Sequence, residues 1–154
     1  MKRSMLAAVA VGLAFAASAV HAQSMKSVAG AYSVTKVEAF GEGARGQMVL
    51  TPNGYYSIVI TRAKMAPIAA GARNKGTDAE NKAVVEGSIA HFGKYTIDDG
   101  GKAITFHVTA ATFPNWDGKP QKRVLKVKGD TLTYTVAAPS NGGGPNDVVW
   151  KRMK

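Results

Sequence analysis

Short segments with the alternation of a β-strand follow one another along almost the whole chain. They are rich in β-branched and aromatic residues, and turn residues such as those of Pro52-Asn53-Gly54 separate them. Short sequential strands favour an up-and-down barrel or a sandwich, and eight strands can close around a narrow lumen. We therefore predict a mainly β protein, an eight-stranded antiparallel up-and-down barrel. The predicted strands cover residues 30–38, 46–51, 55–62, 93–98, 102–111, 122–128, 130–138 and 147–153.

The clearest strand signal, Ala103–Ala111, carries a titratable side chain. His107 shares one face of this strand with Thr105, whereas apolar residues such as Phe106 occupy the other face. In a barrel one of these faces lines the lumen and the other faces outward. Two arrangements stay open: the polar face forms a hydrogen-bonding wall for a ligand, or it lies outside in water.

One helix is predicted between the third and fourth strands. Thr77 and Glu80 have the spacing of a capping box, which predicts a helix over residues 78–90. We interpret residues 63–90 as a cap over one barrel mouth. Three apolar residues lie at helical spacing on one side of this segment: Val85, Ile89 and Phe92.

Residues 1–22 have the pattern of a signal peptide. A basic head, Lys2-Arg3, precedes an uncharged, Ala-rich run, and Val20-His21-Ala22 places small residues where a signal peptidase needs them. The run is shorter than the ~20 residues of a membrane-spanning helix. We expect cleavage after Ala22, a periplasmic or secreted protein, and a mature chain of one domain, residues 23–154, with no integral membrane segment.

Composition and charge limit the kinds of partner that the protein is expected to bind. The chain has no Cys, which leaves no disulfide and no lipoprotein anchor. Removal of Lys2 and Arg3 lowers the formal net charge from +10 to +8. Export argues against nucleic acid as the partner, and the charges are scattered; Lys126 and Lys128, for example, share one face of a strand and indicate a solvated surface.

Six short motifs occur in order along the mature chain: Gly30-Ala31-Tyr32, Leu50-Thr51-Pro52-Asn53-Gly54-Tyr55, His91-Phe92-Gly93-Lys94-Tyr95, His107-Val108, Pro114-Asn115-Trp116 and Val149-Trp150-Lys151-Arg152. With these motifs the chain resembles the bacterial and fungal lipocalin-like domains over essentially its whole mature length. The resemblance implies a calycin-type barrel and assigns no particular reaction. Tyr32 replaces the usual Trp of the opening motif and is expected to plug the barrel floor against Arg152, and His91 replaces the usual aromatic residue.

The candidate ligand-binding residues carry polar groups that could face a ligand. Some of them are aromatic, and the others lie on predicted strands or in a loop at a strand end. Arg62 would recognise a carboxylate bidentately if buried, and otherwise lies in water at the strand mouth. Trp116 would cover a ligand beside Asn115, or would plug the barrel end. The full set is His107, Arg62, Tyr56, Tyr95, Asn115, Trp116 and Thr105.

Metal and catalytic signals are weak. His91 and His107 would form a metal pair only if both faced the same way, and a third ligand would still be needed without any Cys. Neither a Gly-x-Ser-x-Gly elbow nor a phosphate loop is present. We therefore expect no metal and no cofactor, and assign no catalytic residue.

The leading hypothesis is an exported barrel that binds a small hydrophobic or amphipathic molecule in its lumen. One alternative is a cofactor-free isomerase, cyclase or hydratase that uses His107 as acid or base. Another is an envelope interaction module that uses a basic face. The sequence does not determine the ligand, the oligomeric state or any turnover.

Overall fold

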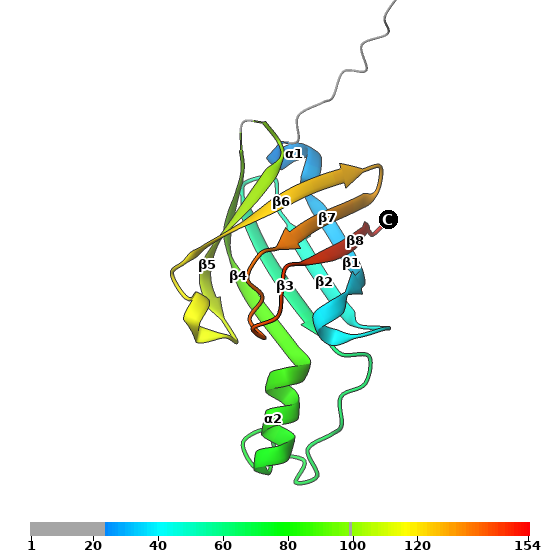
Figure 1. Ribbon diagram of the computed structural model, residues 1–154, viewed down its shortest axis with the longest axis vertical. Helices are drawn as coiled ribbons and strands as arrows, with labels where there is room; N and C mark the ends of the chain where they lie inside the picture. Colours follow the sequence, from blue (N-terminus) through cyan, green and yellow to red (C-terminus); the bar gives the residue numbers. More distant parts are fainter. Residues whose placement is uncertain (1–23, 99) are drawn as a thin grey trace, which may run out of the picture.

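The strands form one closed barrel (Figure 1). The computed structural model describes residues 24–98 and 100–154, so the predicted signal peptide lies outside the described residues. Each strand runs antiparallel to its neighbours in chain order, and the first pairs with the last. The predicted eight-stranded up-and-down barrel is confirmed, and closure excludes the sandwich. The strands are β1 (Gly30–Val37), β2 (Arg45–Leu50), β3 (Tyr55–Thr61), β4 (Ser88–Ile97), β5 (Ala103–Ala111), β6 (Pro120–Lys128), β7 (Thr131–Val136) and β8 (Asn146–Arg152).

Short helices mark the two ends of the barrel. Figure 1 shows α1 at one end and α2 at the opposite end, and we call these the α1 end and the α2 end. None of the helices in residues 24–98 and 100–154 is long and apolar enough to cross a membrane. The helices are α1 (Met25–Val28), the 3-10 helix η1 (Glu38–Phe40), α2 (Asp78–Gly87) and the 3-10 helix η2 (Pro114–Trp116).

Side-chain alternation in β5 decides which face lines the lumen. Ile104 and Phe106 are fully buried, whereas His107 is exposed and Thr105 lies on its side of the strand. The lumen-lining polar wall that one sequence interpretation allowed is therefore wrong. Apolar side chains gain about 25 cal/mol per Å² on leaving water, whereas buried hydroxyl and imidazole groups would need new hydrogen-bond partners.

A bulge joins β4 and β5. Phe92 pairs with Ala110 but Gly93 pairs with Val108, so Thr109 is the extra residue on β5. A Cβ atom at Gly93 would overlap the backbone of the facing strand, which explains why glycine stands at this position.

The α1 end of the lumen is sealed by aromatic side chains. Tyr32, Trp150 and Tyr95 are at most 1 % exposed. The Tyr32 hydroxyl donates to the Val28 carbonyl at 2.6 Å, and the Tyr95 hydroxyl donates to the Thr51 carbonyl at 2.8 Å. The two tyrosine rings therefore close the lumen while backbone carbonyls satisfy their hydroxyl groups, whereas Nε1 of Trp150 is buried without a hydrogen-bond partner among the described residues.

Arg152 locks this seal from the end of the last strand. Its guanidinium carbon lies 4.8 Å from the centre of the Tyr32 ring. The same group donates to the carbonyl oxygen of Ala29 and, at 3.0 Å, to that of Ser27. The expected Tyr32–Arg152 plug is confirmed, and it ties α1 to the barrel.

The predicted helix begins where the capping box placed it but ends earlier. The Glu80 N–H donates to the Thr77 hydroxyl at 3.3 Å, and the Thr77 N–H donates to the Glu80 carboxylate at 2.7 Å. The helix stops at Gly87, because Ile89 already pairs with Ile60 of β3. The prediction that the helix continues to residue 90 was wrong, since ladder pairing with β3 overrides the helical spacing of the apolar residues.

The segment before β4 does not cover the mouth as expected. In Figure 1, α2 extends away from the barrel along the direction of β4, and the preceding loop returns beside it. Val85 is 76 % exposed, and α2 reaches the barrel mouth only with its last turn, where Val84, Val85 and Glu86 lie. The α2 end is consequently left open.

Replacing Arg152 with methionine should lower the free energy of unfolding by about 2 kcal/mol, because two charged hydrogen bonds and a cation–π contact are lost. Lys151→Met, the neighbouring control, removes only an exposed 3.9 Å ion pair with Asp130 and should change stability by less than about 0.5 kcal/mol. Urea unfolding followed by tryptophan fluorescence measures both. Equal effects of the two variants would contradict the proposed lock.

Candidate functional site: a cavity in the α2 end of the barrel

The lumen is hollow at the α2 end. A cavity of about 630 Å³ opens there, between η1, η2, the start of β4 and the loop that joins β7 to β8. This volume lies within the range of roughly 300–1,000 Å³ that is typical of small-molecule sites. Most of its inner wall is apolar, with contributions from several strands and both 3-10 helices, including Phe40, Ile60, Ile89, Phe113, Val136 and Val148.

Arg123 is the principal charge inside this cavity. It lies on β6 with only 4 % of its surface exposed, while its neighbour Lys122 is exposed on the outside. No hydrogen bond or ion pair with the described residues involves its guanidinium, and its Nε is buried without a partner. Burial lowers the pKa of this guanidinium, which nevertheless stays protonated because arginine starts so high.

His91 and Tyr56 form a buried pair beside Arg123. The Tyr56 hydroxyl lies 2.9 Å from Nδ1 of His91, and both residues are at most 6 % exposed. Burial, with the positive charge of Arg123 as a smaller cause, lowers the pKa of His91 to about 4. Burial also raises the pKa of Tyr56. At neutral pH the imidazole is therefore uncharged and the phenol keeps its proton.

Aromatic rings surround these polar groups. The Trp116 ring lies 5.5 Å from the ring of His91, nearly perpendicular to it, and 5.5 Å from the guanidinium carbon of Arg123. Phe113 packs against Trp116 at 5.7 Å. Tyr134 is buried, and burial raises its pKa to about 12. The site thus combines a cation, neutral hydrogen-bonding groups and flat apolar surfaces.

Three of the seven predicted ligand residues lie at or next to this cavity. Arg62 lines the mouth of the cavity and is exposed there. Of its two predicted positions, the one in water at the strand mouth is therefore confirmed. Trp116 lines the cavity wall and is half-buried. Tyr56 lies behind His91 and contacts it directly.

The other four predicted residues lie elsewhere. His107 and Thr105 are on the outer surface of β5, where His107 Nε2 lies 3.3 Å from the Thr96 hydroxyl. Tyr95 belongs to the sealed α1 end, and Asn115 is exposed on η2. His107 instead lines an outer groove of about 530 Å³ together with exposed rings such as Phe92.

Arg123 was not among the residues predicted from the sequence, and His91 was not predicted to bind a ligand. The sequence did contain a signal for Arg123. Arg123, Leu125 and Val127 are two residues apart along a strand and therefore lie on the same face, and the two apolar residues indicate that this face points inward. His91 lay between the predicted helix and the predicted fourth strand. It was therefore not recognised as a strand residue on the same face as Gly93 and Tyr95. His91 and His107 face opposite sides of the barrel wall, so they do not form a pair, and the described residues contain no cluster of three or more His, Cys, Asp or Glu that could hold a metal.

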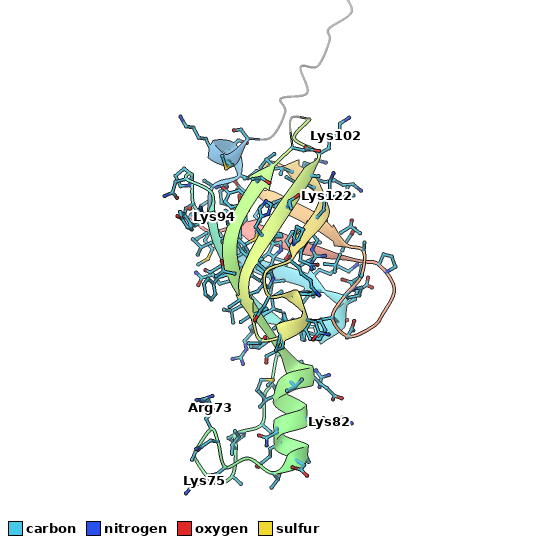
Figure 2. All side chains as sticks on the ribbon, turned by 90° about the vertical axis from the view of Figure 1, so that its left-hand side faces the viewer. Arg73, Lys75, Lys82, Lys94, Lys102 and Lys122 are labelled. Carbon is cyan, nitrogen blue, oxygen red and sulfur yellow. The ribbon has the colours of Figure 1, made fainter. Side chains whose placement is uncertain are left out.

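The basic residues labelled in Figure 2 lie outside the cavity. Figure 2 shows Lys94, Lys102 and Lys122 projecting outward from the barrel, and Lys82 and Arg73 around α2 and its preceding loop. The positive charge predicted to be scattered is thus displayed on the surface, and Arg123 differs from it by lying inside.

A barrel that is sealed at one end and hollow at the other is the architecture of proteins that enclose a small molecule. Sequence comparison agrees with this class: a family model described as a lipocalin-like domain matches residues 22–153. The chain belongs to the lipocalin-like domain family.

A curated relative points to a carrier role. Over 70 residues the chain is 30 % identical to the 4'-hydroxy-3'-methoxypropiophenone carrier protein of Aspergillus oryzae. The match covers 42 % of this chain and 63 % of the relative, so it spans less than two thirds of that protein. Fold, family and relative together support a binding or carrier role.

His91 should make the protein less stable in acid. Its pKa of about 4 in the folded chain lies below the ordinary value of 6.5, so the unfolded chain binds more protons between these values and stability falls as the pH drops through this range. Between pH 7 and pH 5 the loss should be about 2 kcal/mol. Urea unfolding at both pH values should show a smaller difference for His91→Gln.

The matched control is His107→Gln on the outer surface, which should keep the wild-type difference between pH 7 and pH 5. An unchanged pH difference in His91→Gln would show that the buried imidazole does not cause the acid sensitivity.

Proposed function

We propose that the protein binds one small, largely apolar molecule in the α2 end of its barrel and acts as its carrier. The observation that carries this proposal is the 630 Å³ cavity, which opens at the end opposite the aromatic seal. An enclosed, mostly apolar site with a few polar groups is typical of small-molecule binding.

Apolar burial would supply most of the affinity. A ligand that buries roughly 300 Å² of its apolar surface away from water would gain about 7 kcal/mol of binding free energy before the cost of association is subtracted. The inner walls provided by Ile60, Val136 and Val148 are fixed by the strand ladders, so they need little rearrangement to receive a ligand.

The carrier relative supports an aromatic ligand. Its name specifies a propiophenone, a ring with a ketone, a hydroxyl and a methoxy group. In this chain the rings of Trp116, His91 and Phe113 offer flat surfaces at the cavity, against which such a ring would stack. We therefore propose an aromatic molecule as the cargo.

The two alternative functions lose their principal arguments. Acid–base catalysis in the lumen required His107 to face inward, and this residue lies on the outer surface. The outward lysines of Figure 2 leave weak attraction to anionic surfaces open, but they are spread over strands and α2 and define no separate site.

Filling the cavity should abolish binding. Ile89 lines the cavity, so Ile89→Trp would occupy ligand space, whereas Val124→Trp adds the same ring at a position that is 56 % exposed on the outside. Titration with the uncharged fluorescent probe N-phenyl-1-naphthylamine should show saturable binding to the wild type and Val124→Trp, and at least about tenfold weaker binding to Ile89→Trp.

Equal binding of the probe by all three proteins would place it on the surface. That result, or a wild type that binds no apolar probe and carries no co-purified molecule in native mass spectrometry, would contradict the proposed function.

We also propose export, which the sequence pattern of residues 1–22 supports. Expression in a Gram-negative host should deliver a periplasmic protein whose intact mass corresponds to a start at Gln23. Ala22→Asp, which removes the small residue before the cleavage point, should leave a longer, unprocessed chain, whereas Ala16→Ser in the apolar run should still be cleaved. Full-length wild-type protein in the cytoplasm would contradict this proposal.

A further inference from the structure

Arg123 holds a positive charge inside the cavity, and no carboxylate in the part of the chain that the structure describes forms an ion pair with it. Burial of a charge costs several kcal/mol unless it is paired, and the guanidinium Nε has no hydrogen-bond acceptor. Starting from the proposed ligand-binding function, we propose that the cargo carries an anionic oxygen group, such as a carboxylate, which pairs with Arg123 inside the barrel.

The carboxylate at the mouth does not fill this role. Glu86 is the one acidic residue among the described residues that line the cavity. It lies on α2, is exposed, and forms a 3.8 Å ion pair with Lys82. Its charge is thus engaged in water at the rim, away from the buried guanidinium.

The groups nearest to Arg123 are neutral at physiological pH. Tyr56 and Tyr134 keep their protons because burial raises the pKa of both. His91 is uncharged, since burial and Arg123 lower its pKa. Trp116 offers only the face of its ring to the guanidinium. These neighbours lower the cost of burying the charge, but none of them carries a negative charge, and we infer that the bound ligand supplies it.

The arrangement also sets the orientation of the cargo. The buried cation lies among rings within the barrel, whereas exposed residues such as Arg62, Ser140 and Asn141 form the mouth. An anionic group would therefore enter first and accept two parallel hydrogen bonds from the N–H groups of the planar guanidinium. The aromatic body would then rest against Trp116 and the apolar wall towards the mouth.

A pair of ligands with one ring system tests the charge preference. 2-Naphthoate and 2-naphthamide share their shape, but only the first is anionic at pH 7. Calorimetry should give the naphthoate at least about tenfold higher affinity for the wild type. Arg123→Met should remove this preference by weakening naphthoate binding, while its binding of the naphthamide and of N-phenyl-1-naphthylamine shows that the cavity remains intact.

Lys122→Met provides the charge-matched control, because it removes the adjacent positive charge from the outer surface (Figure 2). It should keep the preference of the wild type. Arg62→Met tests the rival cation at the mouth: loss of the preference in this variant, with Arg123→Met unchanged, would overturn the assignment to Arg123.

The outcomes separate the inference from the function on which it rests. Equal affinity of the wild type for both naphthalene ligands would overturn the anionic cargo and leave carrier function standing. Absence of binding by both ligands and by the neutral probe would contradict the two proposals together.

Discussion

Hydrogen bonding between the first and last strands is the constraint on which the molecule depends. The β1–β8 ladder, which pairs Tyr32 with Arg152 and Val34 with Trp150, leaves no open sheet edge and turns the alternation of every strand into an inside and an outside. It also brings Arg152 to the ring of Tyr32, although 119 residues separate them in sequence. The seal at the α1 end is therefore a direct product of closure.

Sealing one end and leaving the other hollow divides the lumen into a stabilising half and a binding half. At the α1 end, Tyr32 and Tyr95 satisfy their hydroxyl groups on backbone carbonyls. At the α2 end, Arg123 has no such partner among residues 24–98 and 100–154. A buried charge without a partner opposes folding, and a bound anionic group would offset this cost. The contrast between the two arginines, Arg152 hydrogen-bonded in the seal and Arg123 unpaired in the cavity, is the main argument for the proposed anionic cargo.

Strand order and the aromatic–arginine plug were predictable because they depend on local signals and on motifs with fixed positions. The orientation of β5 was not, since a strand with one polar and one apolar face fits a lumen of either kind until the packing of the other seven strands is known. Arg123 could have been predicted to face inward because it shares a strand face with Leu125, but a basic residue next to Lys122 also fits an exposed position. His91 was hidden by the helical spacing of Ile89 and Phe92, which the β3 ladder overrides.

By itself the sequence determined the sequential strands, their turns, the start of the helix at Thr77 and the absence of disulfides, because each follows from residues close together in the chain or from composition. Only the tertiary structure decided which faces point inward, that α2 leaves the mouth open, and that His91, Trp116 and Arg123 meet in one cavity. These properties depend on register across strands distant in sequence and on the bulge at Gly93, and a shift of one residue would exchange inside and outside.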